Sequence, residues 1–398
     1  MKPFNSNFAA LGTTIFSVMS ALAVKHGAVN LGQGFPDDAG PDDVRELAAE
    51  KVLTGPHQYP PFQGMPELRQ AVAAHDRRFY GLDHLTADNV LVTSGATEAL
   101  AACFLGLLNP GDEAVVIDPS YDSYRPMITA ADATVRSITL SPPDWRLTED
   151  HLRAAFNERT KLIVVNDPMN PSGKVFSVDE LALIAEYCSR FDAFAVCDEV
   201  YEHLLFDGRR HRPLLTFRGM ESRAIKIGSA GKTFSLTGWK VGYVTAAAEI
   251  IAALSKVHQF LTFTTPPSLQ LAVAHGLAKE DGYFLGLRAE MERRRDRLAA
   301  GLARAGFAVL PCAGTYFLVA DYGALAPGMG SLDFCRKLTE EAGVTAIPLA
   351  AFYGDAPAEP LVRFCFAKKD ETLDAAISRL AAFFGERALS ADAKTSYA

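Results

Sequence analysis

The sequence from Ile225 to Thr233 reads IKIGSAGKT, and it carries the signals of both a strand and a turn. Its opening is rich in β-branched isoleucine, which is typical of a buried strand, and the small residues that follow are typical of a tight turn. The turn presents Lys232 at the carboxyl end of the strand. A lysine amine that is cornered and partly removed from water can attack a carbonyl group, so this stretch is a candidate for Schiff-base chemistry.

The end of this stretch, Gly231 to Thr233, also resembles the end of a nucleotide-binding P-loop. The P-loop pattern requires a glycine six residues before its lysine, and Lys226 occupies that position. The sequence therefore argues against a P-loop. A lone lysine in a turn is usually solvated or structural, so a chemical role for Lys232 depends on partner residues elsewhere in the chain.

Short apolar runs alternate with longer amphipathic stretches on both sides of this motif, which indicates βαβ units around a mostly parallel sheet. The expected strands are Val90–Thr93, Glu113–Ile117, Thr134–Ile138, Leu162–Asn166, Ala193–Cys197, Ala224–Ile227 and Val241–Thr245. The expected helices between them are Thr97–Leu108, Asp150–Phe156 and Ser177–Phe191. Ser177 and Glu180 have the spacing of a capping box.

The pattern changes after about residue 285. It predicts a long charged helix, a second helix and three strands, which together indicate a smaller α+β domain. The helices are expected at Leu287–Ala305 and Leu332–Ala342, and the strands at Phe307–Leu310, Thr315–Ala320 and Leu361–Phe366. The glycine-rich segment Asn30–Pro36 suits a backbone that approaches a ligand, and Ser390–Ala398 are expected to fray.

The composition is that of a folded globular protein with two or three domains: 398 residues, of which 49% are apolar and 22% charged. The 47 acidic residues exceed the 39 basic ones and give a net charge of −8, which argues against nucleic-acid binding. The six cysteines form no CxxC pair and are expected to be reduced core thiols. No signal peptide or membrane span is evident, so we expect a cytoplasmic protein.

Two polar residues at predicted strand ends are candidate partners for Lys232. Asp198 ends an apolar strand, where a buried carboxylate needs a cationic partner such as a protonated pyridine nitrogen. Asn170 lies in a proline-stiffened loop after another strand, which fixes its amide as a donor. Taken singly, each residue is more often part of a turn or of a satisfied ion pair.

Three further positions have both a binding and a structural interpretation. The segment VTSGATEAL from Val92 to Leu100 opens a helix that would favour a phosphate, or it is an ordinary start capped by Ser94. Tyr121 follows the next strand, where it would lie against a ring or in the core. Arg363 interrupts an apolar strand, so it pairs either with a protein carboxylate or with that of a substrate.

In their joint order these elements resemble the class I/II aminotransferases, which are pyridoxal-phosphate enzymes of fold type I. Four motifs carry the resemblance over nearly the whole chain: Asn-Pro-x-Gly at Asn170–Gly173, Asp-x-x-Tyr at Asp198–Tyr201, Ser-x-x-Lys at Ser229–Lys232, and Arg363. Several segments are similar to the branch of kynurenine aminotransferase, glutamine transaminase K and methionine aminotransferase, and N-succinyldiaminopimelate aminotransferases are similar too. These segments are Leu31–Asp37, His57–Tyr59, Gly231–Gly242 and Arg363–Phe366.

The resemblance implies an α/β fold with a large domain built on a mostly parallel seven-stranded sheet and a smaller α+β domain. Residues 45–285 would form the large cofactor-binding domain and residues 286–398 the small domain, which the N-terminal segment 1–44 would join. The active sites of such enzymes lie at the interface of a homodimer. No metal ion is implied.

The resemblance also implies roles around pyridoxal 5′-phosphate. Lys232 would form the Schiff base and shuttle a proton, and Asp198 would keep the pyridine nitrogen protonated. Tyr201 and Asn170 would hydrogen-bond the ring's 3-oxygen, while Tyr121 would stack on its face.

The cofactor phosphate would be held by Ser229, Lys240 and the backbone amides of Ala96 and Thr97, and by Tyr59 of the neighbouring subunit. The family frequently has arginine where this sequence has Lys240, and lysine lacks the two-pronged guanidinium, so this contact would be weaker or differently aimed.

For the substrate, Arg363 would bind the α-carboxylate together with Asn170 and the Gly34 backbone. Phe16, Phe263 and Thr264 would line the side-chain pocket. The segment Thr262–Thr265 carries no charge, so short dicarboxylates should be poor amino donors.

The expected function is transamination, in amino-acid metabolism, between an apolar, aromatic or glutamine-like L-amino acid and a 2-oxo acid. Two alternatives use the same scaffold: β-elimination from cysteine S-conjugates and transamination of N-succinyldiaminopimelate. A cofactor-binding regulator or a nucleotide binder is disfavoured, because the chain has no basic helix-turn-helix extension and the P-loop pattern fails at Lys226.

Overall fold

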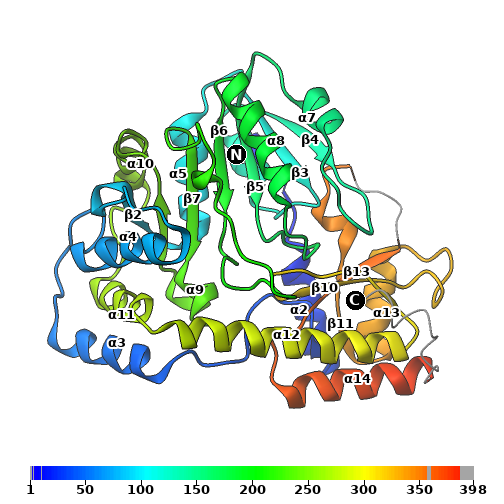
Figure 1. The fold of residues 1–398 in the computed structure, drawn as a ribbon. Coiled ribbons are helices and arrows are strands. Elements are labelled where there is room, and N and C mark those ends of the chain that lie inside the picture. Colours follow the sequence, from blue (N-terminus) through cyan, green and yellow to red (C-terminus); the bar gives the residue numbers. More distant parts are fainter. Residues whose placement is uncertain (1, 3, 10, 356–359, 386–398) are drawn as a thin grey trace.

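A seven-stranded, mostly parallel sheet organises the larger part of the computed structural model, which describes residues 2, 4–9, 11–355 and 360–385 (Figure 1). Its strand order is β2-β8-β7-β6-β5-β3-β4, and only β8 runs antiparallel to its neighbours. The bounds are β2 Val90–Thr93, β3 Glu113–Asp118, β4 Thr134–Thr139, β5 Thr160–Asn166, β6 Phe194–Asp198, β7 Ala224–Ser229 and β8 Gly242–Thr245. All seven predicted strands are thereby confirmed, and with them the fold class.

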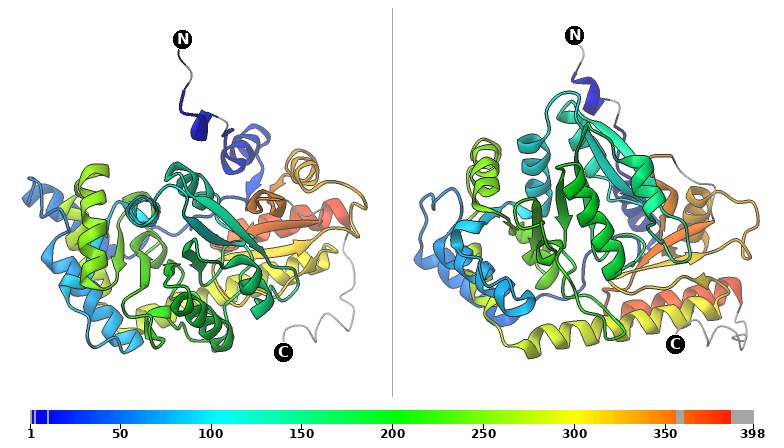
Figure 2. Two further views of the ribbon diagram at one scale, coloured as in Figure 1. Left: turned by 90° about the horizontal axis from the view of Figure 1, so that it is seen from above. Right: turned by 45° about the horizontal axis from the view of Figure 1, so that its top comes forward.

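Helices cover both faces of this sheet (Figure 2). In chain order the helices are α1 Ser6–Ala9, α2 Ile15–His26, α3 Asp42–Thr54, α4 Pro66–Tyr80, α5 Gly95–Leu107, α6 Tyr124–Ala130, α7 Glu149–Ala155, α8 Val178–Arg190, α9 Ala230–Thr233, α10 Ala248–Leu261, α11 Pro267–Leu277, α12 Asp281–Arg304, α13 Ser331–Glu341 and α14 Asp370–Phe384. Five of them, α5, α7, α8, α12 and α13, were predicted. The capping box of Ser177 and Glu180 is present at the start of α8.

Several helices have no counterpart among the sequence predictions. Five of these, α3, α4, α10, α11 and α14, begin without a side-chain hydrogen bond from the capping residue. The usual start signal is therefore missing from their sequences. Such helices are held by packing of an apolar face rather than by local capping.

A second, four-stranded antiparallel sheet has the order β12-β13-β10-β9. Its strands are β9 Ala308–Val309, β10 Phe317–Asp321, β12 Ile347–Pro348 and β13 Leu361–Cys365, which confirms the predicted strands of this part. A short parallel pair joins β1 Val29–Asn30 to β11 Val344–Thr345, so the N-terminal segment pairs with this part of the chain. The domain boundaries at 44/45 and 285/286 stay a prediction.

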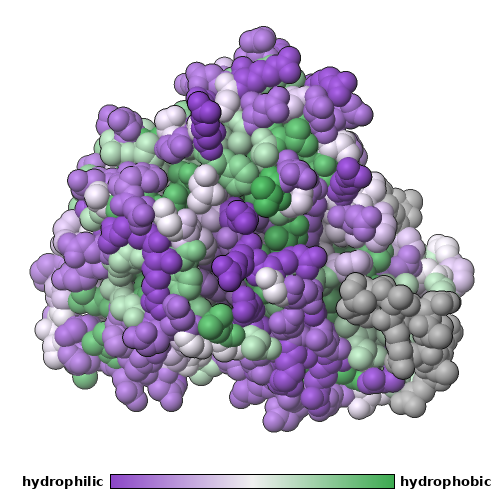
Figure 3. Space-filling view, in the orientation of Figure 1, coloured by the Kyte–Doolittle hydropathy of each residue, from purple (hydrophilic) through white to green (hydrophobic). Residues whose placement is uncertain are grey.

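The 24-residue helix α12 connects the two parts and lies beside α14 (Figures 1 and 2). It begins six residues before the predicted Leu287, and hydrophilic residues gather over it on the face shown in Figure 3. The last predicted feature, fraying of Ser390–Ala398, falls outside the residues that the structure describes.

Neighbouring residues of the central strands pack into opposite core layers. Val164 and Val196 belong to the layer that contains residues of α5 and α10, whereas Val165 and Cys197 belong to the layer that contains residues of α8. Since both faces are covered, the strands read as continuous apolar runs. All six cysteines are buried and free, as expected. Within the described part of the chain, no helix is long and apolar enough to cross a membrane.

Candidate active site

A cavity of about 370 Å³ opens at the carboxyl ends of the parallel strands. In open α/β sheets this edge is where ligands bind. Twelve of the predicted site residues line the cavity, although they come from segments far apart in the sequence. They are Phe16, Gly34, Ala96, Thr97, Tyr121, Asn170, Asp198, Tyr201, Ser229, Lys232, Lys240 and Arg363.

Lys232 lies in the one-turn helix α9, directly after β7. Its Nζ donates a hydrogen bond of 2.6 Å to the Tyr316 hydroxyl, which in turn donates one of 2.7 Å to the Gly34 carbonyl. Burial lowers the pKa of Lys232 to about 8. A substantial fraction of the amine is therefore neutral near physiological pH, as a nucleophile or proton acceptor must be.

Asp198 ends β6 with its carboxylate buried. Oδ2 accepts a hydrogen bond of 2.6 Å from the Tyr124 hydroxyl, whereas Oδ1 has no hydrogen-bond partner among the residues that the structure describes. Burial raises the pKa of this carboxyl. An unsatisfied buried carboxylate oxygen on a cavity wall suits a cationic N–H donor brought by a ligand, and a protonated pyridine nitrogen is such a donor.

Asn166 and Asn170 fix the loop after β5. The Asn166 amide donates to the Asp198 carbonyl at 2.7 Å and accepts the Asn170 backbone N–H at 2.7 Å. The side-chain oxygen of Asn170 then accepts a bond from Arg363, so its amide nitrogen remains to donate into the cavity.

The N-terminus of α5 forms the opposite end of the cavity. Gly95 has a φ of +74°, and a Cβ on Gly242 would lie 2.5 Å from the Gly95 carbonyl carbon, so only glycine at 242 lets β8 approach this closely. Ser94 does not cap the helix with its side chain, which disfavours the ordinary-cap interpretation. The free N–H groups there, with Lys240 and Ser229, suit a phosphate.

Arg363 is buried in β13 and forms no ion pair with an acid of the described residues. Its guanidinium donates to the Asn170 side-chain oxygen and to the Gly32 carbonyl, both at 2.8 Å, and lies 3.8 Å from the centre of the Phe317 ring. No carboxylate of the described residues forms an ion pair with it, and burial lowers its pKa to about 10. The structural salt bridge considered from the sequence is thus absent there, and the group is suited to a substrate carboxylate.

Three predicted residues lie outside the cavity. Tyr59 is 81% exposed, and the centroid of its ring lies 5.2 Å from that of the Phe263 ring. Thr264, next to Phe263 in the sequence, is half-buried. Within one chain these residues do not line the cavity, so the role predicted for them stays a prediction that would need a second subunit.

Two tyrosines that contact the key ionisable groups were missed from the sequence. Tyr316 binds Lys232, but in the sequence it is an aromatic residue in an apolar strand, which is usually core. Tyr124 binds Asp198, but only its neighbour Tyr121 was singled out. The recurrence of tyrosine three residues after Tyr121, at helical spacing, was the available signal.

Comparison with known proteins identifies the family of the chain. Residues 26–380 match the family model described as aminotransferase class I and II. The chain is 46% identical over 386 residues to a probable N-succinyldiaminopimelate aminotransferase of Mycobacterium tuberculosis, covering 94% of this chain and 97% of that one. It is 43% identical over 375 residues to the methionine aminotransferase of Escherichia coli, with the same coverage, and 36% identical to human kynurenine–oxoglutarate transaminase 3, covering 92% and 87%.

Solved structures give the same result. The N-succinyldiaminopimelate aminotransferase of M. tuberculosis superposes with a TM-score of 0.93 at 46% identity, covering 96% of this chain and all of that one. The E. coli methionine aminotransferase superposes with a TM-score of 0.92 at 42% identity, covering 96% and 99%. The chain therefore belongs to the class I and II aminotransferases: it is a fold type I enzyme that uses pyridoxal 5′-phosphate for transamination.

We expect the buried environment of Lys232 to govern how the cofactor-free enzyme takes up pyridoxal phosphate. With a pKa of about 8, roughly a tenth of the amine is neutral at pH 7 and roughly nine tenths at pH 9. The rate of covalent uptake, followed by absorbance, should therefore rise between pH 7 and 9 and then level off. A rate still rising in proportion to hydroxide at pH 10, or a borohydride-fixed label on another lysine, would contradict the assignment.

Proposed function

We propose that this aminotransferase accepts apolar, aromatic or glutamine-like L-amino acids as donors and returns the amino group to a 2-oxo acid. One observation carries the proposal: Arg363 is a buried guanidinium without an acid partner among the described residues, beside the aromatic rings of Phe16 and Phe317. Apart from Arg363, the basic side chains that line the cavity are Lys232 and Lys240. The first is the reactive amine and the second lies at the α5 end.

The fit of the cofactor rests on groups of this chain. When bound, pyridoxal phosphate supplies an electron sink for negative charge at the substrate Cα. Asp198 Oδ1 would hold the ring nitrogen protonated, and Tyr201 and the Asn170 amide would donate to the 3-oxygen. Tyr121 would stack on the ring, and Lys232 Nζ would take and return the proton at Cα.

At the other end of the cavity, the backbone N–H groups of Ala96 and Thr97 would bind the phosphate together with Ser229 and Lys240. The ammonium of Lys240 lies close to Gly95, at the positive end of the 13-residue helix α5. Arg363, Asn170 and the Gly34 backbone would bind the substrate α-carboxylate.

A homodimer would complete the site. Apolar side chains are exposed around Tyr59: Phe260 is 85% exposed, and Leu261 and Phe263 are more than a third exposed. In a dimer, Tyr59 would reach the cofactor phosphate of the neighbouring subunit, and Phe263 and Thr264 its substrate pocket. Such a cluster is the usual mark of a protein interface.

We also retain the predicted division at 44/45 and 285/286, because α12 bridges the two sheets at the second boundary. A cytoplasmic location agrees with six free cysteines. If limited proteolysis between residues 260 and 290 released no stable fragment, this would count against that boundary. Recovery of the protein outside the cytoplasm would count against the proposed location.

A second substrate has one observation in its favour, the 46% identity to a relative named as a probable N-succinyldiaminopimelate aminotransferase. A long substrate could place its distal carboxylate at the cavity mouth and leave it hydrated. β-Elimination from cysteine conjugates would use the same groups. Product analysis separates them, because elimination yields pyruvate and a thiol whereas transamination yields a new amino acid.

We expect methionine, glutamine, phenylalanine or kynurenine to exceed aspartate by at least about tenfold in kcat/KM, which corresponds to roughly 1.4 kcal/mol. A short second carboxylate would lose hydration beside Phe16 and Phe317 without gaining a cation. First-half-reaction rates measured by absorbance test this, with asparagine as the uncharged isostere of aspartate. An aspartate rate equal to that of methionine would show that the pocket holds a second cation.

We expect Asp198→Asn to lower kcat by about 100-fold or more, because the neutral amide cannot keep the ring nitrogen protonated. Tyr124→Phe is the matched control: it removes one hydrogen bond to the same carboxylate and should cost less than about tenfold. Steady-state kinetics at saturating cofactor test both variants. Equal losses would mean that Asp198 only orders its surroundings.

We expect the protein to sediment at twice its chain mass of 43.0 kDa. Phe260→Asp should weaken the dimer, because it places a charge in the exposed apolar cluster. The control Lys256→Asp, at an exposed position, should not weaken it. Sedimentation equilibrium over a range of concentrations measures this. A monomer with full activity would remove the proposed roles of Tyr59, Phe263 and Thr264.

A further inference from the structure

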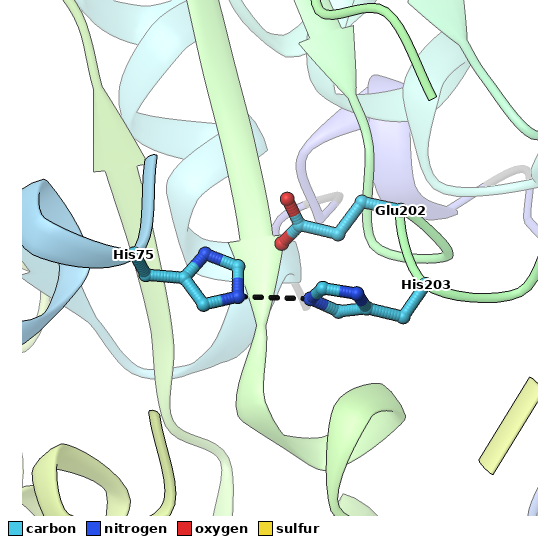
Figure 4. Close-up of side chains that lie close together, drawn as sticks. All are labelled: His75, Glu202 and His203. Atoms are coloured by element: carbon cyan, nitrogen blue, oxygen red, sulfur yellow. Dashed lines mark hydrogen bonds between the residues drawn. The ribbon is translucent and has the colours of Figure 1, made fainter. Parts of the chain in front are cut away.

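A second group of ionisable side chains lies away from the cavity that Lys232 lines. His75 belongs to α4, and Glu202 and His203 follow β6 (Figure 4). The two Nε2 atoms of the histidines are 2.9 Å apart, and one ligand atom from each of the three residues lies within 4.8 Å of the others. Figure 4 shows the Glu202 carboxylate facing the two rings.

Glu202 has one oxygen free for a further partner. Its Oε2 accepts the Tyr80 hydroxyl at 2.6 Å and lies 2.7 Å from Lys226 Nζ. Its Oε1 is buried without a hydrogen-bond partner in the described part of the chain. Glu202 is only 3% exposed, so this oxygen has no bulk water to satisfy it.

The charge of the group favours a cation. Asp76 and Glu202 are both buried carboxylates, and Lys226 is the ammonium between them, at 3.1 Å from Asp76 Oδ1. The two carboxylates thus share one ammonium, and Glu202 Oε1 remains open to a further cation.

We propose that His75, His203 and Glu202 form a binding site for a first-row divalent transition metal ion such as Zn²⁺, separate from the transamination site. Imidazole nitrogens and a carboxylate oxygen are ligands that zinc takes, with Zn–N distances of about 2.0–2.1 Å. Tetrahedral geometry then puts two ligating nitrogens roughly 3.3 Å apart. Binding would therefore move the two ring nitrogens apart by a few tenths of an ångström, turn both rings toward the ion and draw the Glu202 carboxylate closer.

The surroundings supply two further features of a metal site. Asp76 Oδ1 lies 4.0 Å from the other ring nitrogen of His75, which is beyond hydrogen-bond distance, so the ring would have to move closer for this carboxylate to orient a ligating histidine. A cavity of about 410 Å³ reaches Glu202 and His203 and gives access to solvent. Arg209, Arg210 and Arg288 also line it, which favours an anion or hydroxide as the fourth ligand.

The competing explanation is that the histidines only pack and hydrogen-bond each other. The His75 ring lies 4.6 Å from that of Phe79, and the His203 ring 4.5 Å from that of Phe284. This explanation leaves Glu202 Oε1 without a partner among the described residues. The two explanations differ in whether an added ion is bound at this place.

The deciding experiment uses crystals of the holoenzyme freed of metal with a chelator and then soaked in Zn²⁺. Anomalous diffraction at the zinc edge should show a peak within about 2.3 Å of both Nε2 atoms. No peak, or peaks only at other positions, would overturn the proposal. This test needs no variant, so it is independent of any folding defect.

A solution measurement adds a matched control. In equilibrium dialysis of the holoenzyme followed by metal analysis, His203→Gln should raise the Kd for Zn²⁺ by at least about tenfold. His211→Gln should leave it within about threefold, because His211 is a nearby buried histidine that bonds Glu199 at 2.8 Å and lies outside the ligand set. Equal effects of the two variants, or none from His203→Gln, would contradict the site.

Discussion

Burial of three ionisable groups in one cavity is the constraint on which the site depends. Lys232, Asp198 and Arg363 are each removed from water, and burial shifts the pKa of each toward its neutral form. Two of them have an unsatisfied polar atom within the described chain: Asp198 Oδ1 lacks a donor and Arg363 Nε lacks an acceptor. A fold holds such groups only when the remaining structure fixes them firmly. Their unpaired donors and acceptors determine which ligand groups fit the cavity.

The rest of the architecture serves to fix them. Strand ends position Asp198 and Ser229, the α9 turn positions Lys232, and β13 brings Arg363 from the second sheet. Two hydrogen bonds join the two parts at the cavity, from Arg363 to Asn170 and from Lys232 to Tyr316. The proposed substrate site would therefore lie between the two sheets, with the cofactor groups on the first and the carboxylate anchor on the second.

The sequence predicted the larger sheet well for a physical reason. Its strands are covered on both faces, so they are continuous β-branched runs that need no knowledge of their neighbours. The site residues at strand ends and turns were found because polar residues are conspicuous after such runs. Helices such as α10 and α11 were not predicted, because they are held by packing that a single sequence does not display.

Contacts between residues far apart in the sequence could not be predicted from local patterns. Tyr316 is 84 residues from Lys232, and His75 is 128 residues from His203, so neither contact is visible in a local pattern. An isolated tyrosine or histidine in an apolar segment is usually core, and only the fold shows what it meets. The predicted residues Tyr59, Phe263 and Thr264 do not line the cavity of this chain, so a role for them at a site would need a second chain.

The segment from Asp198 to Glu202 shows how one short stretch supplies two sites. Asp198 and Tyr201 line the cavity that Lys232 also lines, whereas Glu199 bonds His211 and Glu202 lines the other cavity. Side chains of a strand alternate between its faces, so a shift of one residue in the register of β6 would exchange Asp198 for Glu199. The longer side chain of Glu199 would then stand where Asp198 is proposed to face the cofactor's ring nitrogen. His211 would lose its carboxylate partner. The register of β6 is thus set on both of its faces. The apolar layers fix it along the strand, and Asp198 and Glu199, which need different partners, fix it at the end.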